Sequence, residues 1–256
     1  MNLPPVPFYF VRHGETDYNK DNKIMGQIDI PLNEVGLHQA QLVATKLQHL
    51  EISHIISSPL KRALQTSEII ASTLNKPVTI IDELMQNHLG VWEGRNKKEF
   101  LNETGIENLF EYLKTGGHIQ GAEKWSDFVS RISTGLSSAL TSSISQKPIL
   151  IVAHKPTYWA ISQILNAQIM EIDAKNCSAY FFTPPTSDSN QWIVTELCQK
   201  IKKYESKIIF QKQEYNNYKI LELSDDRLLN FIAKLLSNNS GTDWIKQELL
   251  KEDLFE

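Results

Sequence analysis

The sequence is poor in cysteine, in excess basic charge and in long apolar runs. Two cysteines in 256 residues are too few for a disulfide scaffold, and Cys177 and Cys198 lack the spacing of metal ligands. Because the 26 basic residues are outnumbered by 30 acidic ones, no basic surface for nucleic acid is expected. No apolar stretch approaches the roughly 20 residues that cross a bilayer. These absences argue against a disulfide-rich secreted domain and predict neither a nucleic-acid nor a membrane partner.

The N-terminal segment shows no targeting signal. It reads MNLPPVPFYFVRHG, with no basic stretch before its apolar run, and that run is broken by prolines and ended by Arg12 and His13. Hydrophobic residues make up 41% of the chain and charged residues 22%, a balance typical of globular proteins that bury a sizeable core. We therefore expect a globular, cytoplasmic protein whose two cysteines stay reduced.

Short apolar runs alternate with amphipathic segments over the first 198 residues. The apolar runs predict strands at residues 6–11, 53–57, 78–81, 148–153, 179–183 and 191–197. Helical spacing of apolar residues predicts helices at residues 34–50, 58–74, 128–140 and 157–166, and the polar stretch 95–123 predicts short helices and a loop. This alternation predicts an α/β fold, a three-layer αβα sandwich with a mostly parallel central sheet and an antiparallel edge.

The C-terminal segment differs in pattern from the rest of the chain. Residues 199–256 contain 10 basic and 10 acidic residues. Ser224 is positioned to cap a helix whose apolar face comprises Leu228, Leu229, Ile232, Leu235 and Leu236. We expect one domain at residues 1–198 and a small, mostly helical extension at 199–256. Its apolar face predicts packing, either on the first domain or on a second copy of the chain in a homodimer.

Histidine and arginine residues follow the predicted strands. Arg12 and His13 come after the first strand, Arg62 lies just beyond the second, and His154 follows the fourth. Because ligands of parallel α/β sheets bind beyond the carboxyl ends of the strands, these side chains are expected to share one pocket. Guanidinium groups hold phosphate through paired, charge-assisted hydrogen bonds, and Asn19 adds a neutral donor. The pattern predicts a binding site for a phosphate dianion.

The segment RHGETDYN at residues 12–19 resembles the signature of the histidine phosphatase superfamily, the phosphoglycerate mutase-like proteins. Further blocks follow in the family's order: MGQIDIPLNEVGLHQA at 25–40, SSPLKRALQTSEII at 57–70, HLGVWEG at 88–94, GAEKWSDFVSR at 121–131 and LIVAHKPTYWAI at 150–161. The resemblance extends over residues 6–197. RHG alone recurs by chance in many chains, but RHGET followed by these ordered blocks is specific.

The resemblance implies a phosphoglycerate mutase-like fold and a role for each matching residue. His13 matches the nucleophile that forms a phosphohistidine. Arg12 and Arg62 match the phosphate clamps, and His154 matches the second histidine, which holds the equatorial phosphoryl oxygens. Asn19 matches a contact to phosphate or substrate. The resemblance implies hydrolysis of a small phosphorylated metabolite, with no metal and no other cofactor.

One position departs from the family pattern in a way that affects catalysis. The family places an acidic residue two positions before its HLG-like block, where it protonates the leaving alkoxide and then activates water. Gln86 stands at that position, in DELMQNHLG. An amide can neither donate a proton as an acid nor take one as a base, which leaves Gln86 as a substrate contact. Glu83 is the nearest substitute acid, but in an extended segment it points away from Gln86, so it needs a rearranged loop.

Smaller departures lie beside two other motifs. Met25 and Gly26 are expected to contact the substrate. Met25 stands where many small-molecule phosphatases of the family have a polar residue, and it is expected to line an apolar part of the substrate pocket or to pack in the core. Lys155 and Pro156 follow His154, where the family usually has a glycine. Lys155 adds positive charge near the pocket, and Pro156 removes a backbone donor.

Two functions from different classes remain open. Mutases of the family carry a long insertion before the second histidine, and only about 60 residues separate Gly94 from His154 here, so we expect phosphomonoester hydrolysis and not mutase activity. The alternative is a catalytically weakened or degenerate phosphate-binding or interaction protein, which Gln86 and the C-terminal extension suggest. A variant of the first keeps catalysis but restricts it to leaving groups that need little protonation, such as phosphohistidine or acyl phosphate.

Overall fold

The computed structural model describes residues 3–141, 147–168, 174–186 and 191–197. The strands and helices named below all lie within the unit Met1–Glu196. The predicted extension at 199–256, with its helix and its homodimer surface, lies outside the described residues, as does Cys198. The boundary after residue 198 therefore stays a prediction.

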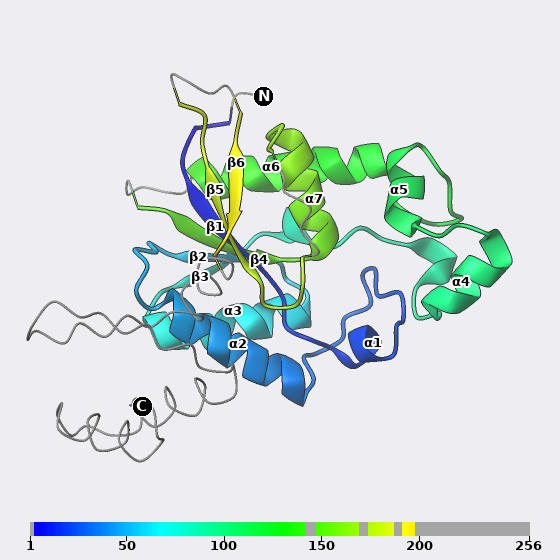
Figure 1. Ribbon diagram of the computed structural model, residues 1–256, viewed down its shortest axis with the longest axis horizontal. Coiled ribbons are helices and arrows are strands. Elements are labelled where there is room, and N and C mark those ends of the chain that lie inside the picture. The colour runs from blue at the N-terminus through cyan, green and yellow to red at the C-terminus, as the bar shows by residue number, and fades with distance from the viewer. Residues whose placement is uncertain (1–2, 142–146, 169–173, 187–190, 198–256) are drawn as a thin grey trace, which may run out of the picture. The chain divides into compact units, whose positions relative to one another are not determined.

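The first strand, β1 (Phe8–Arg12), lies inside a six-stranded sheet with the order β3-β2-β4-β1-β5-β6 (Figure 1). The other strands are β2 (Ile55–Ser57), β3 (Val78–Ile80), β4 (Ile149–Ala153), β5 (Ala179–Thr183) and β6 (Ile193–Glu196). Strands β3, β2, β4 and β1 run parallel, whereas β5 pairs antiparallel with both β1 and β6. The structure confirms the mostly parallel sheet with an antiparallel edge.

Helices cover both faces of the sheet, as predicted for an αβα sandwich (Figure 1). On one face α2 (Glu34–Leu47) packs beside α3 (Lys61–Leu74), and on the other α6 (Trp125–Thr141) packs beside α7 (Lys155–Ile164). Phe10 and Ile151 of the sheet join Phe128, Ile132 and Tyr158 in the core under α6 and α7. Burial of each such side chain contributes roughly 1.5–3 kcal/mol, and this fixes the strands from which the site residues project.

Two helices begin at other residues than the sequence predicts. α3 begins at Lys61 and not at residue 58. The carboxylate of Asp29, in the loop before α2, accepts a hydrogen bond from the Lys61 amide (2.7 Å). α7 begins at Lys155, directly after His154, and not at residue 157. Pro156 fits there because amides in the first turn have no intrahelical acceptor. The second shift places the N-terminus of α7 directly after the end of β4 and beside His154.

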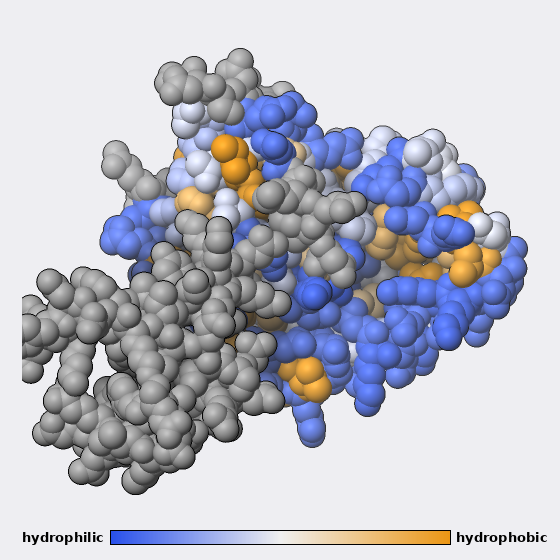
Figure 2. All heavy atoms as spheres, in the orientation of Figure 1, coloured by the Kyte–Doolittle hydropathy of each residue, from blue (hydrophilic) through white to orange (hydrophobic). Residues whose placement is uncertain are grey.

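Short helices occupy the polar stretch before α6, as predicted. They are α4 (Lys97–Thr104) and α5 (Leu109–Lys114), and the 3-10 turns η1 (Asp82–Leu84) and η2 (Gly90–Trp92) precede them. We call residues 90–114 the helical wall. It is attached to the sandwich by Phe110, whose ring meets that of Trp159 in α7 edge-on, with centroids 5.0 Å apart. Figure 2 shows apolar surface over this region framed by hydrophilic side chains, and Val91 and Leu101 are exposed there.

None of the described helices is both long and apolar enough to cross a bilayer.

Candidate active site

The two histidines predicted at strand ends lie side by side. Strands β1 and β4 are adjacent, with Arg12 opposite Ala153, so His13 and His154 leave the sheet at the same edge. Their ring centroids are 5.2 Å apart, and both side chains are buried. The amide of His13 donates to the carbonyl of Ala153 (3.0 Å), which continues the strand pairing into the site. The sheet itself therefore sets the separation of the two rings.

One local contact determines which nitrogen of His13 carries the proton. His13 Nδ1 lies 2.7 Å from the carbonyl oxygen of Gly14. A carbonyl can only accept, so Nδ1 carries the hydrogen. In a neutral imidazole the other nitrogen then holds a lone pair. His13 Nε2 is therefore the nucleophilic atom.

Burial and two arginines keep both imidazoles neutral. Burial lowers the pKa of His13 well below its ordinary value of 6.5, and the charges of Arg62 and Arg12 lower this pKa further. Burial is also the main cause that lowers the pKa of His154 well below 6.5, with Arg62, His13 and Arg12 contributing. Nucleophilic attack requires the neutral ring, because a protonated ring has no lone pair to offer.

Ser58 orients the ring of His154. Ser58 Oγ lies 2.8 Å from His154 Nε2 and also accepts from the amide of Leu60 (3.4 Å). When the Ser58 hydroxyl donates its proton to Nε2, the ring proton of His154 is on Nδ1. His154 Nδ1 is buried and has no hydrogen-bond partner among the described residues. A buried donor without an acceptor costs about 1–3 kcal/mol, so Nδ1 is a natural contact for an anionic ligand.

Arg62 is fully buried, and its guanidinium is held in place by three acceptors. Nη1 donates to the carbonyl of Ile28 (2.9 Å), and Nη2 donates to the carbonyl of Gly26 (2.9 Å) and to Gln86 Oε1 (3.1 Å). Its Nε is buried without a partner among the described residues. Burial lowers the pKa of Arg62 to about 10, against the opposing charge of Asp29, so the group stays cationic at neutral pH. Arg62 is therefore a fixed positive charge whose Nε–H remains available to a ligand.

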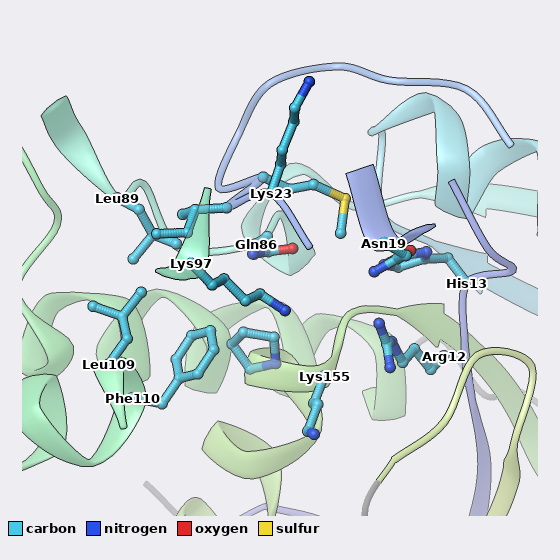
Figure 3. A pocket seen from close by; sticks show the side chains of 13 residues that line it. Arg12, His13, Asn19, Lys23, Gln86, Leu89, Lys97, Leu109, Phe110 and Lys155 are labelled. Atoms are coloured by element: carbon cyan, nitrogen blue, oxygen red, sulfur yellow. The ribbon is translucent and has the colours of Figure 1, made fainter. Parts of the chain in front are cut away.

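A cavity of about 80 Å³ opens beside His13 (Figure 3). One water needs roughly 10–15 Å³, so the cavity holds several atoms of a ligand. Its lining comprises Arg12, His13, Asn19, Lys23, Ile24, Met25, Gln86, Leu89, Lys97, Leu109, Phe110, Lys155 and Pro156. The structure therefore brings together Arg12, His13, Asn19, Met25 and Gln86, as the sequence predicts.

Gly26 contributes backbone to the site and not a side chain. Its φ is +52°, and a Cβ at this position would lie 1.8 Å from Glu93 Oε1. That same carboxylate oxygen accepts hydrogen bonds from the amides of Gln27 (2.9 Å) and Leu89 (2.8 Å). Glycine is required here because the loop that supplies the carbonyls for Arg62 is folded directly onto Glu93.

The structure places Glu83 away from the cavity. Glu83 lies in η1 and not in an extended segment, and a Cβ added to Gly135 of α6 would come within 2.8 Å of the Glu83 Cβ. The Glu83 carbonyl accepts from Arg131 Nη1 (2.7 Å), which holds the turn against α6. Glu83 is not among the lining residues. The hypothesis that a rearranged loop carries this carboxylate to the pocket is therefore not supported by the observed geometry.

Asn19 and Met25 are tied together through Thr16. Asn19 Oδ1 accepts from the Thr16 amide (3.2 Å), and Thr16 Oγ1 lies 3.4 Å from Met25 Sδ. With its oxygen engaged inside the protein, Asn19 has its amide nitrogen to offer a ligand. Met25 is buried and also lines the cavity, so the structure combines the two roles that the sequence left open.

Asn176 is a site residue that the sequence reasoning missed. Its Nδ2 donates to the carbonyl of His13 (3.0 Å) and to Asn19 Oδ1 (3.3 Å). Asn176 precedes β5, which runs antiparallel to β1. The start of β5 therefore lies at the same edge of the sheet as the end of β1. That rule, applied to the NCS segment before the predicted strand at 179–183, would have found it. Lys97, Leu109 and Phe110 were also missed, because the helical wall carries no pattern that points to a site.

The loop after β1 packs backbone against backbone on α2. A Cβ on Gly14 would lie 2.5 Å from the carbonyl oxygen of Gly36, and one on Gly36 would lie 2.1 Å from that of Glu15. The Gly14 amide also donates to Thr66 Oγ1 of α3 (3.1 Å). Neither glycine can carry a side chain unless the loop that presents His13 shifts.

Comparison with known proteins shows which family the chain matches. Residues 8–196 match the family model described as the histidine phosphatase superfamily (branch 1). The probable phosphoglycerate mutase GpmB of Photorhabdus laumondii is 35% identical over 144 residues, which cover 56% of this chain and 67% of that protein. The protein of the same description from Escherichia fergusonii is 37% identical over 146 residues, with the same shares covered.

Solved structures share the fold. A mycobacterial glucosyl-3-phosphoglycerate phosphatase gives a TM-score of 0.64 at 24% identity, over 75% of this chain and 97% of that one. A phosphoserine phosphatase from Entamoeba histolytica gives 0.58 at 25% identity, over 74% and 95%. A phosphoglycerate mutase from Bacillus anthracis gives 0.62 at 20% identity, over 75% and 92%. These similarities confirm the phosphoglycerate mutase-like fold, and the names include both phosphatases and mutases.

Proposed function

Because the chain belongs to branch 1 of the histidine phosphatase superfamily, we propose that it hydrolyses small phosphomonoesters through a phosphohistidine on His13. One observation carries the proposal. The Gly14 carbonyl holds His13 Nδ1 at 2.7 Å, so a buried, neutral ring offers Nε2 as a nucleophile beside Arg12 and Arg62. His154 is also buried beside the same two arginines, but its Nε2 is engaged by Ser58 Oγ at 2.8 Å.

The reaction proceeds in two displacements. His13 Nε2 attacks phosphorus, the new P–N bond forms, and the ester P–O bond breaks with its electron pair leaving on the alkoxide, which then takes a proton. Water next attacks phosphorus and gives up a proton, and the P–N bond breaks with its pair returning to Nε2. Inorganic phosphate leaves, and His13 is again neutral.

Arg12, Arg62 and His154 bind and neutralise the transferred group. Phosphoryl transfer depends on positioning and on charge neutralisation more than on elaborate covalent chemistry. Arg62 Nε and His154 Nδ1 are buried donors without acceptors among the described residues, and phosphoryl oxygens would satisfy both. The arginines supply the positive charge in this proposal, so no step calls for a metal.

We favour hydrolysis over mutase activity, although relatives carry both names. A mutase must return the phosphoryl group to the bound sugar acid, and for that it must keep water out. Among the described residues of the short connection between Gly94 and His154, those that line the cavity are Lys97, Leu109 and Phe110, all in the helical wall. An assay that follows inorganic phosphate and interconversion of phosphoglycerates in parallel separates the two reactions.

The amide at Gln86 supports a restriction on the leaving group. Gln86 lines the cavity, and its Oε1 accepts from Arg62 Nη2 at 3.1 Å. It therefore takes part in the clamp but has no acidic proton for a departing alkoxide. Substrates with stable leaving groups, such as aryl or acyl phosphates, are expected to react much faster than alkyl phosphates. The second candidate function follows from the same residue: a protein that binds phosphate compounds without turning them over.

Trapping of the covalent intermediate tests the proposal. The protein is mixed with ³²P-labelled acetyl phosphate, quenched, and examined for protein-bound phosphate that is labile in acid and stable in base. We expect the label in the parent protein and in the exposed control His38→Ala, and none in His13→Ala. Label that persists in His13→Ala overturns the assignment of the nucleophile. Tight phosphate binding with neither label nor release of phosphate favours the second candidate.

A further inference from the structure

We infer that Asn176 is a positioning residue, which holds the amide of Asn19 at a fixed place beside the nucleophile. The inference rests on the proposed function, because the cavity that Asn19 and His13 both line is taken to hold the phosphoryl group (Figure 3). Asn176 itself does not line the cavity. It lies in the segment 174–178, which we call the β5 turn because it leads directly into that strand.

Backbone groups of the β5 turn fasten it to Arg12. The carbonyl of Ala174 accepts from Arg12 Nη1 (2.6 Å), and the amide of Cys177 donates to the carbonyl of Arg12 (3.0 Å). Cys177 has a φ of +54°, in the left-handed region that residues other than glycine rarely adopt. Such a conformation persists only where the surroundings hold the backbone. The turn is therefore fixed against the end of β1, and the Asn176 side chain starts from a fixed place.

The side chain of Asn176 bridges the nucleophile and Asn19. Its Nδ2 donates to the carbonyl oxygen of His13 (3.0 Å) and to Asn19 Oδ1 (3.3 Å). A carbonyl oxygen only accepts, so the contact with His13 determines which end of the Asn176 amide faces the site. The amide nitrogen carries two hydrogens, and the two acceptors use both of them. Asn176 therefore ties the position of Asn19 to the backbone of the residue that attacks phosphorus.

The same contacts determine which end of the Asn19 amide faces a ligand. Asn19 Oδ1 accepts from Asn176 Nδ2 and from the backbone amide of Thr16 (3.2 Å). A flipped amide would set its nitrogen against these donors and would turn its oxygen to an anionic phosphoryl group. With the oxygen held by donors from two parts of the chain, the Nδ2 hydrogens of Asn19 remain for the ligand.

Packing contributes little to holding Asn19. The residue lies in α1 (Asp17–Lys20), a helix of four residues with no buried side chain. Thr16 belongs to the same loop as Asn19, so it moves with that loop and does not fix it to the sheet. Among the hydrogen bonds of the described residues, the one from Asn176 links the Asn19 side chain to a distant part of the chain. Because a misplacement of about 1 Å can cost a reaction about 10²-fold, Asn176 can affect the rate without touching the substrate.

A double-mutant cycle on the full-length protein tests this role, with Asn19→Ala, Asn176→Ala and the variant that carries both changes. The quantities measured are kcat/KM for p-nitrophenyl phosphate and the dissociation constant of inorganic phosphate, by isothermal titration, which needs no turnover. Asn176→Ser is a second variant that keeps a polar side chain, but its single hydroxyl proton can satisfy only one of the two acceptors. Asn102→Ala is the matched control, because Asn102 is exposed and does not line the cavity.

We expect Asn176→Ala to lower kcat/KM about 10-fold and to weaken phosphate binding about threefold, within the range of one lost hydrogen bond. Asn176→Ser should show the same pattern with smaller losses, and Asn102→Ala should match the parent. In the Asn19→Ala protein, Asn176→Ala should change both quantities less than about twofold, because the group that Asn176 positions is gone. A role in folding alone would give the same loss with and without the Asn19 side chain.

The outcomes separate this role from the proposed hydrolysis. Equal losses in both backgrounds, or Asn176 variants that match the parent, overturn the positioning role, while phosphate release and labelling of His13 uphold the enzyme. Coupling between Asn19 and Asn176 in phosphate binding, without labelling or phosphate release, upholds the positioning role and overturns hydrolysis. A parent protein that neither binds nor releases phosphate overturns both.

Discussion

The two ends of the cavity are built in different ways. At the phosphate end, Arg12 and His13 line the cavity, and Arg62 and His154 lie beside His13 without being part of the lining. Three of these four side chains are almost completely buried, and backbone or side-chain groups hold each of those three. At the lysine end, which comprises Lys23, Lys97 and Lys155, the side chains are partly or fully exposed and stand on short or terminal segments. The residues of the phosphate end are held by the sheet and the elements packed on it. The lysines stand on a loop and on the first turns of two helices at the surface.

This difference suggests how reaction and selectivity are divided within the molecule. A nucleophile and its clamp must be held to a fraction of an ångström, and strand ends in a packed sheet provide that rigidity. Long, exposed lysines can adjust to ligands of different shape, because their side chains keep several rotamers. Changes at the phosphate end should therefore alter the rate for every substrate. Changes at the lysine end should alter the choice among substrates.

The largest effect is expected for Arg62→Lys. Lysine keeps the charge but cannot reproduce the fork that reaches Gly26, Ile28 and Gln86 together, so the clamp loses its orientation. We expect kcat/KM for aryl phosphates to fall by about 10²–10³-fold, the cost of losing one aligned donor to a transition state. Arg131→Lys is the matched control: it loosens η1 and lowers the melting temperature, but it should leave most of the activity. Equal losses in both variants would show that Arg62 acts only through folding.

A smaller gain is expected for Gln86→Glu. A carboxyl group at this position can protonate the leaving oxygen, and general acid catalysis contributes about 10²–10⁴-fold. Arg62 Nη2, 3.1 Å from Gln86 Oε1, would favour the ionised carboxylate and lower its pKa, so we expect only about a 10- to 100-fold gain with alkyl phosphates. Aryl phosphates should gain less.

The control for that variant is Gln27→Glu, which makes the same chemical change in a residue that hydrogen-bonds to the Gln86 backbone. The ratio of aryl to alkyl turnover is the quantity to measure. If Gln86→Glu leaves this ratio at the parent value, the missing acid is not what limits alkyl substrates.

Acid should destabilise the protein through the phosphate end. The pKa values of His13 and His154 lie well below 6.5 in the folded state, so below about pH 6.5 the unfolded chain binds protons that the folded chain does not. Stability therefore falls as pH decreases, by up to about 1.4 kcal/mol per pH unit for each histidine. Urea unfolding between pH 7.5 and 5 measures the slope. His154→Gln should make it shallower, whereas the exposed control His38→Gln should leave it as in the parent.

The smallest effect is expected from salt. Exposed lysines are screened at high ionic strength, since the Debye length is about 10 Å at 0.1 M and about 3 Å at 1 M. For a phosphate ester, which carries negative charge at neutral pH, kcat/KM should fall a few-fold over this range, with kcat almost constant. Lys97→Gln should flatten this dependence. A parallel fall in kcat would place the effect of salt at the buried phosphate end instead.

The phosphate end could be predicted from the sequence because strand ends obey a simple rule. Arg12, His13 and His154 follow apolar runs, and residues that follow parallel strands meet at one edge of the sheet. Arg62 needed the resemblance as well, since its side chain reaches the site from within α3. The antiparallel edge was predicted, but its contribution, Asn176, was overlooked because the rule was applied only to the ends of strands.

The lysine end could not be predicted in the same way. The helical wall has short helices, and whether Lys97 or Phe110 faces the cavity depends on how those helices pack on α7. The same holds for Glu83: the segment before Gln86 closes in a 3-10 turn against Gly135, and only this packing shows that Glu83 is not part of the cavity lining. Tertiary packing decides such positions, and local periodicity carries no information about it.

The backbone contact between Gly14 and Gly36 has a consequence for how the protein opens. No side chain separates the loop that carries His13 from the start of α2, and their backbones are in direct contact. A movement of the loop therefore disturbs the start of the helix, and a movement of the helix disturbs the loop. They should therefore belong to one cooperative unit of local unfolding. In hydrogen exchange, the amide of Gly14 should then show the same protection as the amides of the first turns of α2, and the nucleophile should lose its position in the same event that releases this helix from the sheet.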